Sequence, residues 1–354
     1  MKNNDKILEI ILNKVKKEYY EDVSLVCCYG SFVNGMENKK SDIDFYFVPK
    51  TDRAWELSTT FIVDGIGYDF WGVNWKRLEK MANFNDTFIS LVDGAKIVYS
   101  HSEDDKQKFN ELKQKIKKTV ASPLCIEMLS KAINHIKEAE HHYFLMISNE
   151  DKKSKLLNAG IILLKISDAV CLMNNSFLRY GTKRHFEEIN ALKYLPNKFA
   201  DNYNIIVGKK DILNIIDACF DLILSANKLH EALHDKVFQP KEPSDYLGGH
   251  YEEISSSFNK IYQNCDDNNP SLAFVNSIFL QGTIDHILFE CGIEQIDFIS
   301  SYESDNLPKF KDAVMMAEEQ FLSHLKKHDI SIKQYASILD LENYLFSKSV
   351  SNNK

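Results

Sequence analysis

The sequence lacks the cysteine pattern of a disulfide-bonded secreted protein. Its seven cysteines are odd in number and irregularly spaced, whereas a disulfide framework needs paired cysteines. Cys27 and Cys28 lie inside an apolar run that predicts a buried strand, in which adjacent side chains point to opposite faces. We therefore expect reduced, buried thiols.

Long uncharged apolar runs are also missing. Residues 1–20 mix charged and apolar positions and predict an amphipathic helix, because a signal peptide needs a continuous apolar stretch and a small-residue cleavage site. The most apolar stretch, residues 156–173, contains Lys165 and Asp168 and falls short of the roughly 20 uncharged residues of a membrane span. We expect a cytoplasmic protein that is not bound to a membrane.

Basic stripes interleaved with aromatic residues, which are typical of nucleic-acid-binding faces, are absent as well. The 43 basic and 51 acidic residues give a net charge of −8, so we expect no nucleic-acid partner. An acidic protein suits a cationic small molecule better. The 354 residues, 44% of them hydrophobic, are enough for two or three domains, each with its own core.

What the sequence does contain is an acidic pair in a strand-like context. Residues 29–45 read YGSFVNGMENKKSDIDF. In a strand, alternate side chains share a face, so Asp42 and Asp44 project together while Ile43 and Phe45 point into the core. Two carboxylates held this close raise each other's pKa unless a cation lies between them, and Mg²⁺ is the hard cation that such a pair binds beside phosphates.

The residues before the acidic pair suit an anion. The apolar run Val23–Cys28 predicts a strand that ends at Gly30, where the missing Cβ lets backbone N–H groups approach a phosphate. Ser31 can donate a hydrogen bond to the same group. A third carboxylate, Asp69, lies in the alternating residues 67–73 and can reach the same face. The simpler alternative is a surface turn and a strand whose acidic residues face solvent.

Gly30-Ser31, the following loop with Gly35, and Asp42-Ile43-Asp44 resemble the signature of the DNA polymerase beta-type nucleotidyltransferase superfamily. The resemblance covers about the first third of the chain. It implies that Gly30 and Ser31 hold the phosphates of a nucleoside triphosphate and that Asp42 and Asp44 bind two Mg²⁺ ions.

The resemblance also implies a reaction. A nucleoside monophosphate, expected to be AMP from ATP, would move to a hydroxyl of a small cationic acceptor, as in aminoglycoside and lincosamide nucleotidyltransferases. Asp69 would bind metal or act as the general base. Related antibiotic enzymes can take the base from the helical domain, where the acidic candidates are Glu127, Glu138 and Glu140.

The chain changes character near residue 120, where strand-like alternation gives way to helical periodicity. We predict an α+β fold: a nucleotidyltransferase-type mixed sheet flanked by helices in residues 1–120, a helical bundle that binds acceptor and nucleotide in 121–240, and a C-terminal helical subdomain in 241–354. A linker is expected at 239–245. The helices are expected at 126–143, 156–178, 211–235, 251–262, 272–291, 309–327 and 332–346.

Residues 179–184, RYGTKR, place three cations around a glycine that reads as the cap of the preceding helix. This arrangement resembles a feature of antibiotic nucleotidyltransferases, in which a basic residue of the helical domain reaches the nucleotide phosphates. Lys183 is our first candidate for that role and Arg184 the second. Alternatively, these cations only stabilise the carboxyl end of a helix.

Two further sets of polar residues lie on predicted helices. The buried helix at 156–178 carries a polar stripe that either lines a cleft or faces solvent: Asn158, Lys165, Asp168 and Asn175. The histidines at 135, 141 and 142 lack the i, i+4 spacing that two zinc ligands on one helix prefer. We interpret them as surface imidazoles.

Two other functions stay open. A nucleotidyltransferase of the toxin-neutralising type would modify a protein or RNA, and Arg179 with His185 resembles the Arg-x(4–6)-His pattern of HEPN-type RNases. The other alternative is a catalytically silent nucleotide-sensing module, against which the intact Asp42 and Asp44 argue. The last hundred or so residues either extend the acceptor pocket or form a homodimer interface.

Overall fold

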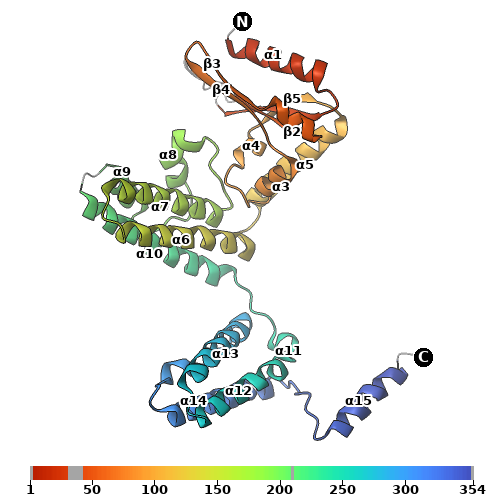
Figure 1. Cartoon of the computed structure of the whole chain (residues 1–354), viewed down its shortest axis with the longest axis vertical. Coiled ribbons are helices and arrows are strands. Elements are labelled where there is room, and N and C mark those ends of the chain that lie inside the picture. Colours follow the sequence, from red (N-terminus) through yellow and green to blue (C-terminus); the bar gives the residue numbers. More distant parts are fainter. Residues whose placement is uncertain (1–2, 31–42, 209–210, 352–354) are drawn as a thin grey trace. The chain divides into compact units, whose positions relative to one another are not determined.

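The computed structural model describes residues 3–30, 43–208 and 211–351. The chain separates into two compact units, Met1–Phe238 and Gln239–Lys354, and each is described here by itself. Figure 1 shows the elements of both units along the chain.

The first unit begins with a mixed five-stranded sheet (Figure 1). In the order β3-β4-β2-β1-β5, the pairs β3/β4, β2/β1 and β1/β5 are antiparallel and β4/β2 is parallel. The strands are β1 (Val23–Tyr29), β2 (Asp44–Pro49), β3 (Thr59–Val63), β4 (Ile66–Gly72) and β5 (Lys96–Ser100).

Helices cover both faces of this sheet (Figure 1). Helix α1 (Asn3–Glu18) lies on one face, where Phe45 and Phe47 are fully buried with its apolar side chains. The opposite face, which carries Cys27 and Tyr46, packs against α3 (Trp75–Ala82), α4 (Ser90–Asp93) and α5 (Glu103–Ala121). β2 therefore sends alternate side chains into two separate cores, as the period of 2 predicts.

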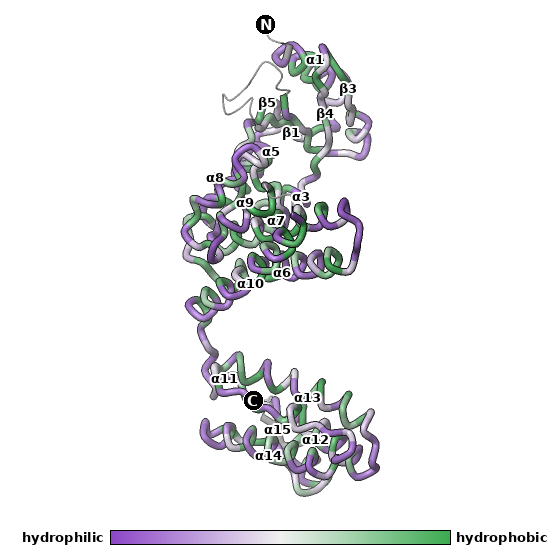
Figure 2. The backbone as a smooth tube through the Cα atoms, turned by 90° about the vertical axis from the view of Figure 1, so that its left-hand side faces the viewer, coloured by the Kyte–Doolittle hydropathy of each residue, from purple (hydrophilic) through white to green (hydrophobic). Residues whose placement is uncertain are grey.

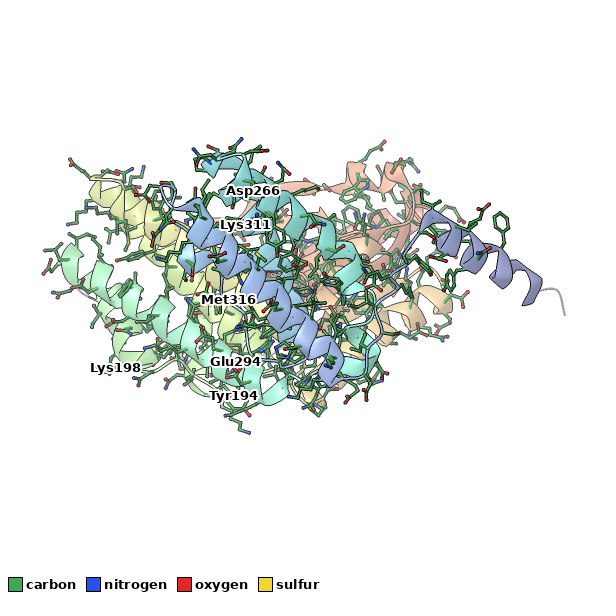
Figure 3. All side chains as sticks on the ribbon, turned by 90° about the horizontal axis from the view of Figure 1, so that it is seen from below. Tyr194, Lys198, Asp266, Glu294, Lys311 and Met316 are labelled. Carbon is green, nitrogen blue, oxygen red and sulfur yellow. The ribbon has the colours of Figure 1, made fainter. Side chains whose placement is uncertain are left out.

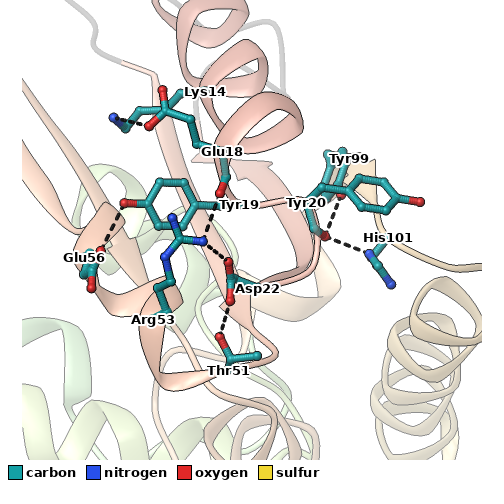
Figure 4. A network of polar contacts seen from close by, with 10 residues as sticks. All are labelled: Lys14, Glu18, Tyr19, Tyr20, Asp22, Thr51, Arg53, Glu56, Tyr99 and His101. Carbon is teal, nitrogen blue, oxygen red and sulfur yellow. Dashed lines mark hydrogen bonds and ion pairs between the residues drawn. The ribbon is translucent and has the colours of Figure 1, made fainter.

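Polar contacts tie the end of α1 to the sheet (Figure 4). Asp22 accepts hydrogen bonds from the Thr51 hydroxyl and from Arg53 Nη1, the latter at 2.7 Å. The Arg53 guanidinium also lies over the Tyr19 ring, 4.6 Å from its centroid. These contacts connect α1 to the short helix η1 (Asp52–Leu57), which follows β2.

A helical bundle completes the first unit. Its central helix α7 is apolar on nearly all sides, as Figure 2 shows by colour, and buries eleven of its residues. The apolar core runs without a break from the sheet through α5 into α6 and α7. The bundle elements are α6 (Ile126–Ile147), α7 (Lys152–Met173), η2 (Gly181–Arg184), α8 (His185–Asn190), α9 (Phe199–Gly208) and α10 (Ile212–Val237).

The second unit has its own apolar core. Glu318 accepts hydrogen bonds from the hydroxyls of Tyr251 and Tyr262, and an ion pair of 2.7 Å joins Lys311 to Asp266, both labelled in Figure 3. Its elements are α11 (Pro243–Tyr246), α12 (His250–Asp266), α13 (Pro270–Glu290), η3 (Ile299–Ser301), α14 (Leu307–Lys327) and α15 (Ile338–Ser351).

The predicted α+β fold is confirmed, and several helix bounds differ from the prediction. The central helix ends at Met173, five residues early, because Asn175 adopts a positive φ of 49°. The last helix begins at Ile338, because Ser337 Oγ accepts a hydrogen bond from Asp340 N. The short helices α8 and α9 were not expected.

By length and composition alone, two helices of the described chain could cross a membrane, α7 and α13. The core helix of a soluble protein passes the same test, and most of α7 is buried in the bundle. The prediction that the chain is not bound to a membrane stays a prediction.

Candidate functional site

Gly30 and Asp44 meet at the end of the β1/β2 pair. Tyr29, the last residue of β1, pairs with Asp44, the first residue of β2. Gly30 follows with a φ of +71°, and a Cβ at this position would overlap the Asp44 carboxylate. Glycine is therefore required here for two reasons: the backbone lies in the left-handed region, and the Asp44 carboxylate occupies the space of a side chain.

Asp69 lies on the same face of the sheet as Asp44. In the parallel β2/β4 pair, Phe45 is opposite Phe70, and Asp44 and Asp69 each precede one of these residues. Opposite residues of neighbouring strands project to the same side. Asp69 is exposed and pairs with Thr60 of β3.

Ser31 and Asp42 lie outside the described residues. Among the described residues, no group of three or more His, Cys, Asp or Glu side chains is arranged to hold a metal ion. Asp44 nevertheless fits such an ion in kind, since it offers carboxylate oxygens in a cradle that only glycine leaves open, and oxygen ligands are those that Mg²⁺ prefers.

A cavity of about 330 Å³ lies between this sheet edge and the basic segment 179–184. We call it the sheet-edge cavity. Gly30 and Asp44 line it, and so do both predicted cations, Lys183 and Arg184. The remaining lining comes from Tyr29, Trp71, Phe88, Ser90, Leu91, Gly94 and residues 179–182. Five of the predicted residues thus line one cavity. Gly30 and Asp44 come from the sheet, and the three cations Arg179, Lys183 and Arg184 come from the basic segment.

Two anchors hold the basic segment in place. Arg179 Nη1 donates a hydrogen bond of 2.8 Å to Asp93 at the end of α4. The backbone N–H groups of Arg179 and Tyr180 donate to the Glu188 carboxylate at 3.0 and 3.1 Å. Lys183, by contrast, is exposed, and its ammonium forms no ion pair with any residue that the structure describes.

The predicted helix cap at Gly181 is wrong. The long helix ends at Met173, and Gly181, with a φ of +57°, instead begins η2. Lys183 and Arg184 are in the last turn of this short 3₁₀ helix, so stabilisation of the long helix does not account for them.

A second, larger cavity of about 510 Å³ lies between the segment 84–89 and the bundle. We call it the bundle cavity. Phe88 lines both cavities, so they are neighbours. Arg77 lines the bundle cavity, and its guanidinium lies 5.5 Å from the ring centroid of Trp71, which lines the sheet-edge cavity.

Among the three glutamates proposed as bases, Glu138 lines the bundle cavity. It forms an ion pair with Lys165, and the hydrogen bond from this lysine lowers its pKa. Glu127 is bound at 2.7 Å by Lys131, which lowers the Glu127 pKa, and Glu140 accepts from Asn227.

The polar stripe of α7 divides between two environments. Asp168 lines the bundle cavity, and burial raises its pKa to about 6. Asn158 and Asn175 are buried and hydrogen-bond within the bundle, to Ser154 and Ser122. The stripe is therefore not a solvent-facing strip.

The interpretation of the histidines as surface imidazoles is wrong for two of them. His135 is partly buried, lines the bundle cavity, and has Nδ1 3.9 Å from Asp168 Oδ2. Burial lowers its pKa. His142 Nδ1 lies 2.8 Å from Asn158 Oδ1, and His141 is exposed.

Arg179 and His185, the pair that resembles the RNase pattern, have different partners. Arg179 is bound to Asp93, whereas His185 is buried, with Nδ1 3.1 Å from the Tyr203 hydroxyl. Burial also lowers the His185 pKa. A buried imidazole engaged with a tyrosine is poorly placed to reach an RNA phosphate.

Sequence reasoning missed most of the cavity walls. Phe88 and Ser90 line the sheet-edge cavity, and Asp86 and Phe177 line the bundle cavity. Aromatic and small polar residues at irregular spacing are common in any core, so the sequence carried no signal for them. The spacing of the acidic pair predicts a shared face only because it repeats a strand period.

Two comparisons with known proteins found a similarity. Residues 8–122 match the family model of the nucleotidyltransferase domain. A solved structure, a nucleotidyltransferase-like protein from Exiguobacterium sibiricum, aligns over 70% of this chain and 87% of its own, with 10% identity and a TM-score of 0.34. A search of the curated proteins found no match.

Proposed function

We propose, from the match of residues 8–122 to the nucleotidyltransferase domain, that the chain transfers AMP from ATP to a hydroxyl of a small cationic molecule. The acceptor class that we propose is that of aminoglycoside- or lincosamide-like antibiotics. Mg²⁺ is the proposed metal.

The sheet-edge cavity is the observation that supports this proposal most. Its lining includes Asp44 and Gly30 from the sheet together with Arg179, Lys183 and Arg184 from the helical part. A triphosphate needs a metal-binding carboxylate at its reacting phosphate and cations along its tail. Lys183, whose ammonium forms no ion pair within the described chain, can give its full charge to a phosphate.

Asp42 and Asp44 would hold the metal, with Asp69 as the third carboxylate on the same face. Mg²⁺, when bound, neutralises charge on the attacking and leaving oxygens. Ser31 would donate a hydrogen bond to a phosphate oxygen, and Gly30 keeps the backbone close to it. A carboxylate, either Asp69 or Glu138, would accept the proton of the acceptor hydroxyl.

We place the acceptor in the bundle cavity. Its volume of about 510 Å³ lies within the range of small-molecule sites. Phe88 separates it from the sheet-edge cavity, so an acceptor there would lie beside the nucleotide.

The test is pyrophosphate release from each of the four ribonucleoside triphosphates, with and without Mg²⁺, against a panel of aminoglycosides and lincosamides. The double variant Asp42→Asn/Asp44→Asn should abolish release while circular dichroism shows an intact fold. Asp52→Asn, an exposed aspartate of the same domain, is the matched control and should retain activity.

Each alternative function has its own outcome. Full activity in the double variant would overturn the metal assignment. Triphosphate binding without release on the whole panel would favour the nucleotide-sensing module, and release with a protein or RNA acceptor alone would favour the toxin-neutralising type. RNA cleavage that is lost in His185→Ala would support the HEPN-type alternative.

A further inference from the structure

The charges that line the bundle cavity do not balance locally. Three carboxylates line it: Asp86, Glu138 and Asp168. Arg77 Nε donates to Asp86 Oδ2 at 3.0 Å, and Lys165 forms an ion pair with Glu138. Asp86 and Glu138 thus each have a cation as an ion-pair partner. Asp168 is the one of the three lining carboxylates for which no such ion pair with a lysine or arginine is found among the described residues.

The neighbour of Asp168 within the cavity is an imidazole. His135 Nδ1 lies 3.9 Å from Asp168 Oδ2, too far for a hydrogen bond, and this buried nitrogen has no hydrogen-bond partner among the described residues. Burial and the charge of Lys165 both lower the His135 pKa, so the ring is neutral at pH 7. Asp168 therefore has no full positive charge beside it that belongs to it alone.

The other charged groups around Asp168 are accounted for. Helix α6 contributes Lys131, whose Nζ donates to Glu127 and to the carbonyl of Asn83. Its own helix contributes Lys165 and the buried thiol Cys171, whose pKa is raised to about 12 and which stays neutral. Arg77 and Asp86 neutralise each other.

The remaining walls of the bundle cavity are partly apolar, and the polar side chains of Asn85, Thr87, Asn134 and Ser176 complete them. The apolar part comes from the segment 84–89 and from the end of α7 with the residues after it, and includes Phe84, Phe88, Leu172, Phe177 and Leu178. Phe84 and Phe177 meet edge to face, with ring centroids 6.1 Å apart. A ligand with one cationic group and an apolar surface can therefore contact both Asp168 and these rings.

We propose that the bundle cavity binds a protonated amine on a compact apolar or aromatic body, with Asp168 as the specificity-determining residue. An ammonium N–H would donate to the Asp168 carboxylate, and the body would pack against the phenylalanine rings. The claim that the amine is the acceptor of the reaction rests on the proposed function. The claim that the cavity binds an amine rests on the cavity alone.

The proposal narrows the acceptor class. An ammonium on an apolar body matches a cavity with one carboxylate that lacks a cation and with aromatic walls. A polyhydroxylated polycation would place some of its polar groups against the phenylalanine rings, which offer them no hydrogen-bond partner, at a cost in binding free energy.

Binding should depend on pH through Asp168. Burial raises the pKa of Asp168 to about 6, so the carboxylate is ionised at pH 7 and mostly protonated about one unit below 6. An alkylammonium stays charged at both values, because such amines titrate near pH 10. Affinity should therefore fall on acidification, although the ligand itself does not change.

The experiment uses benzylamine as the probe and benzyl alcohol as its uncharged counterpart, on the full chain without nucleotide or metal. Ligand-detected NMR titration gives both affinities at about pH 7 and about pH 5. We expect the amine to bind about tenfold or more tightly than the alcohol at the higher pH, and this preference to disappear at the lower pH.

Variants separate Asp168 from other causes. Asp168→Asn should remove the preference for the amine at the higher pH, whereas Asp235→Asn, an exposed aspartate of α10, should keep it. His135→Asn should keep the pH dependence, since Asp168 carries it. The alcohol, measured at both pH values and on each variant, reports whether the cavity is intact.

Equal affinities for amine and alcohol in the wild-type chain would overturn the proposal, and so would an amine preference that survives in a folded Asp168→Asn. If that variant does not fold, the wild-type pH comparison still decides. Because no nucleotide is present, this binding result does not depend on whether the chain transfers nucleotides. Transfer to polycations alone would contradict the proposed acceptor class, but it would not contradict the metal assignment to Asp42 and Asp44.

Discussion

Gly30 combines a backbone requirement and a steric one in a single residue. Its φ is +71°, and a Cβ would overlap Asp44 Oδ2. We expect Gly30→Ala to lose nearly all nucleotidyl transfer, because the Asp44 carboxylate must move away from the sheet edge. The backbone strain alone should cost about 1–2 kcal/mol of the free energy of unfolding.

The chain supplies a matched control for this prediction. Gly65, in the turn between β3 and β4, has a φ of +75° and no atom within 4 Å of a Cβ built on it. Gly65→Ala should therefore show a similar loss of stability in thermal unfolding and keep its activity. If both variants lose activity equally, strain rather than the contact with Asp44 is the cause.

At the scale of elements, the position of the basic segment 179–184 depends on the residues that anchor it, and one of these is Glu188. Glu188 on α8 accepts the backbone N–H groups of Arg179 and Tyr180. We expect Glu188→Ala to weaken triphosphate binding, because the segment loses its position. Lys183→Ala should weaken the same binding by about 1–3 kcal/mol, the value of a charge-assisted hydrogen bond.

The direction in which Glu188→Ala changes the triphosphate affinity distinguishes a positioning role from a purely electrostatic one. Removing a negative charge near an anion would otherwise tighten binding. Glu187→Ala is the matched control, since Glu187 is the exposed neighbour with the same charge. Isothermal titration with a non-hydrolysable triphosphate measures all three variants, and tighter binding by Glu188→Ala would contradict the positioning role.

At the scale of the whole molecule, the apolar cores define what can fold alone. The core of the second unit shares no residue with those of the first. We therefore expect the fragment 1–238 to unfold cooperatively, at a temperature close to the matching transition of the full chain. Scanning calorimetry of both samples makes the comparison.

A fragment of residues 1–120, the predicted catalytic domain, should behave differently. One core runs from the sheet through Phe109 and Ile116 of α5 into Leu129 and Ile166 of the bundle. Cutting at 120 would expose this surface, and large exposed apolar surfaces promote association. A soluble, cooperatively folding 1–120 fragment would show that the boundary expected at 120 separates independent domains.

Much of the fold could be predicted because its signals are local. Alternation placed Asp44 and Phe45 on opposite faces of β2, and a period of 3.6 residues located α6, α10, α13 and α14 within a few residues. Local rules were less reliable at helix ends: Asn175 ended α7 early with a positive φ, and the short helices α8 and α9 have too few turns for a period to show.

The sequence by itself determined the α+β fold, because alternation and helical periodicity depend on neighbours along the chain. The site formed by Gly30, Ser31, Asp42 and Asp44 is a prediction from the same local pattern. Only the tertiary structure decided which distant groups share a hollow. Lys183 and Asp44 line the same cavity, and Asp168 lies near His135 in the bundle cavity. Spacing along the chain carries no information on such pairs, because helix packing and burial, which also set the Asp168 pKa, arise only when the chain is folded.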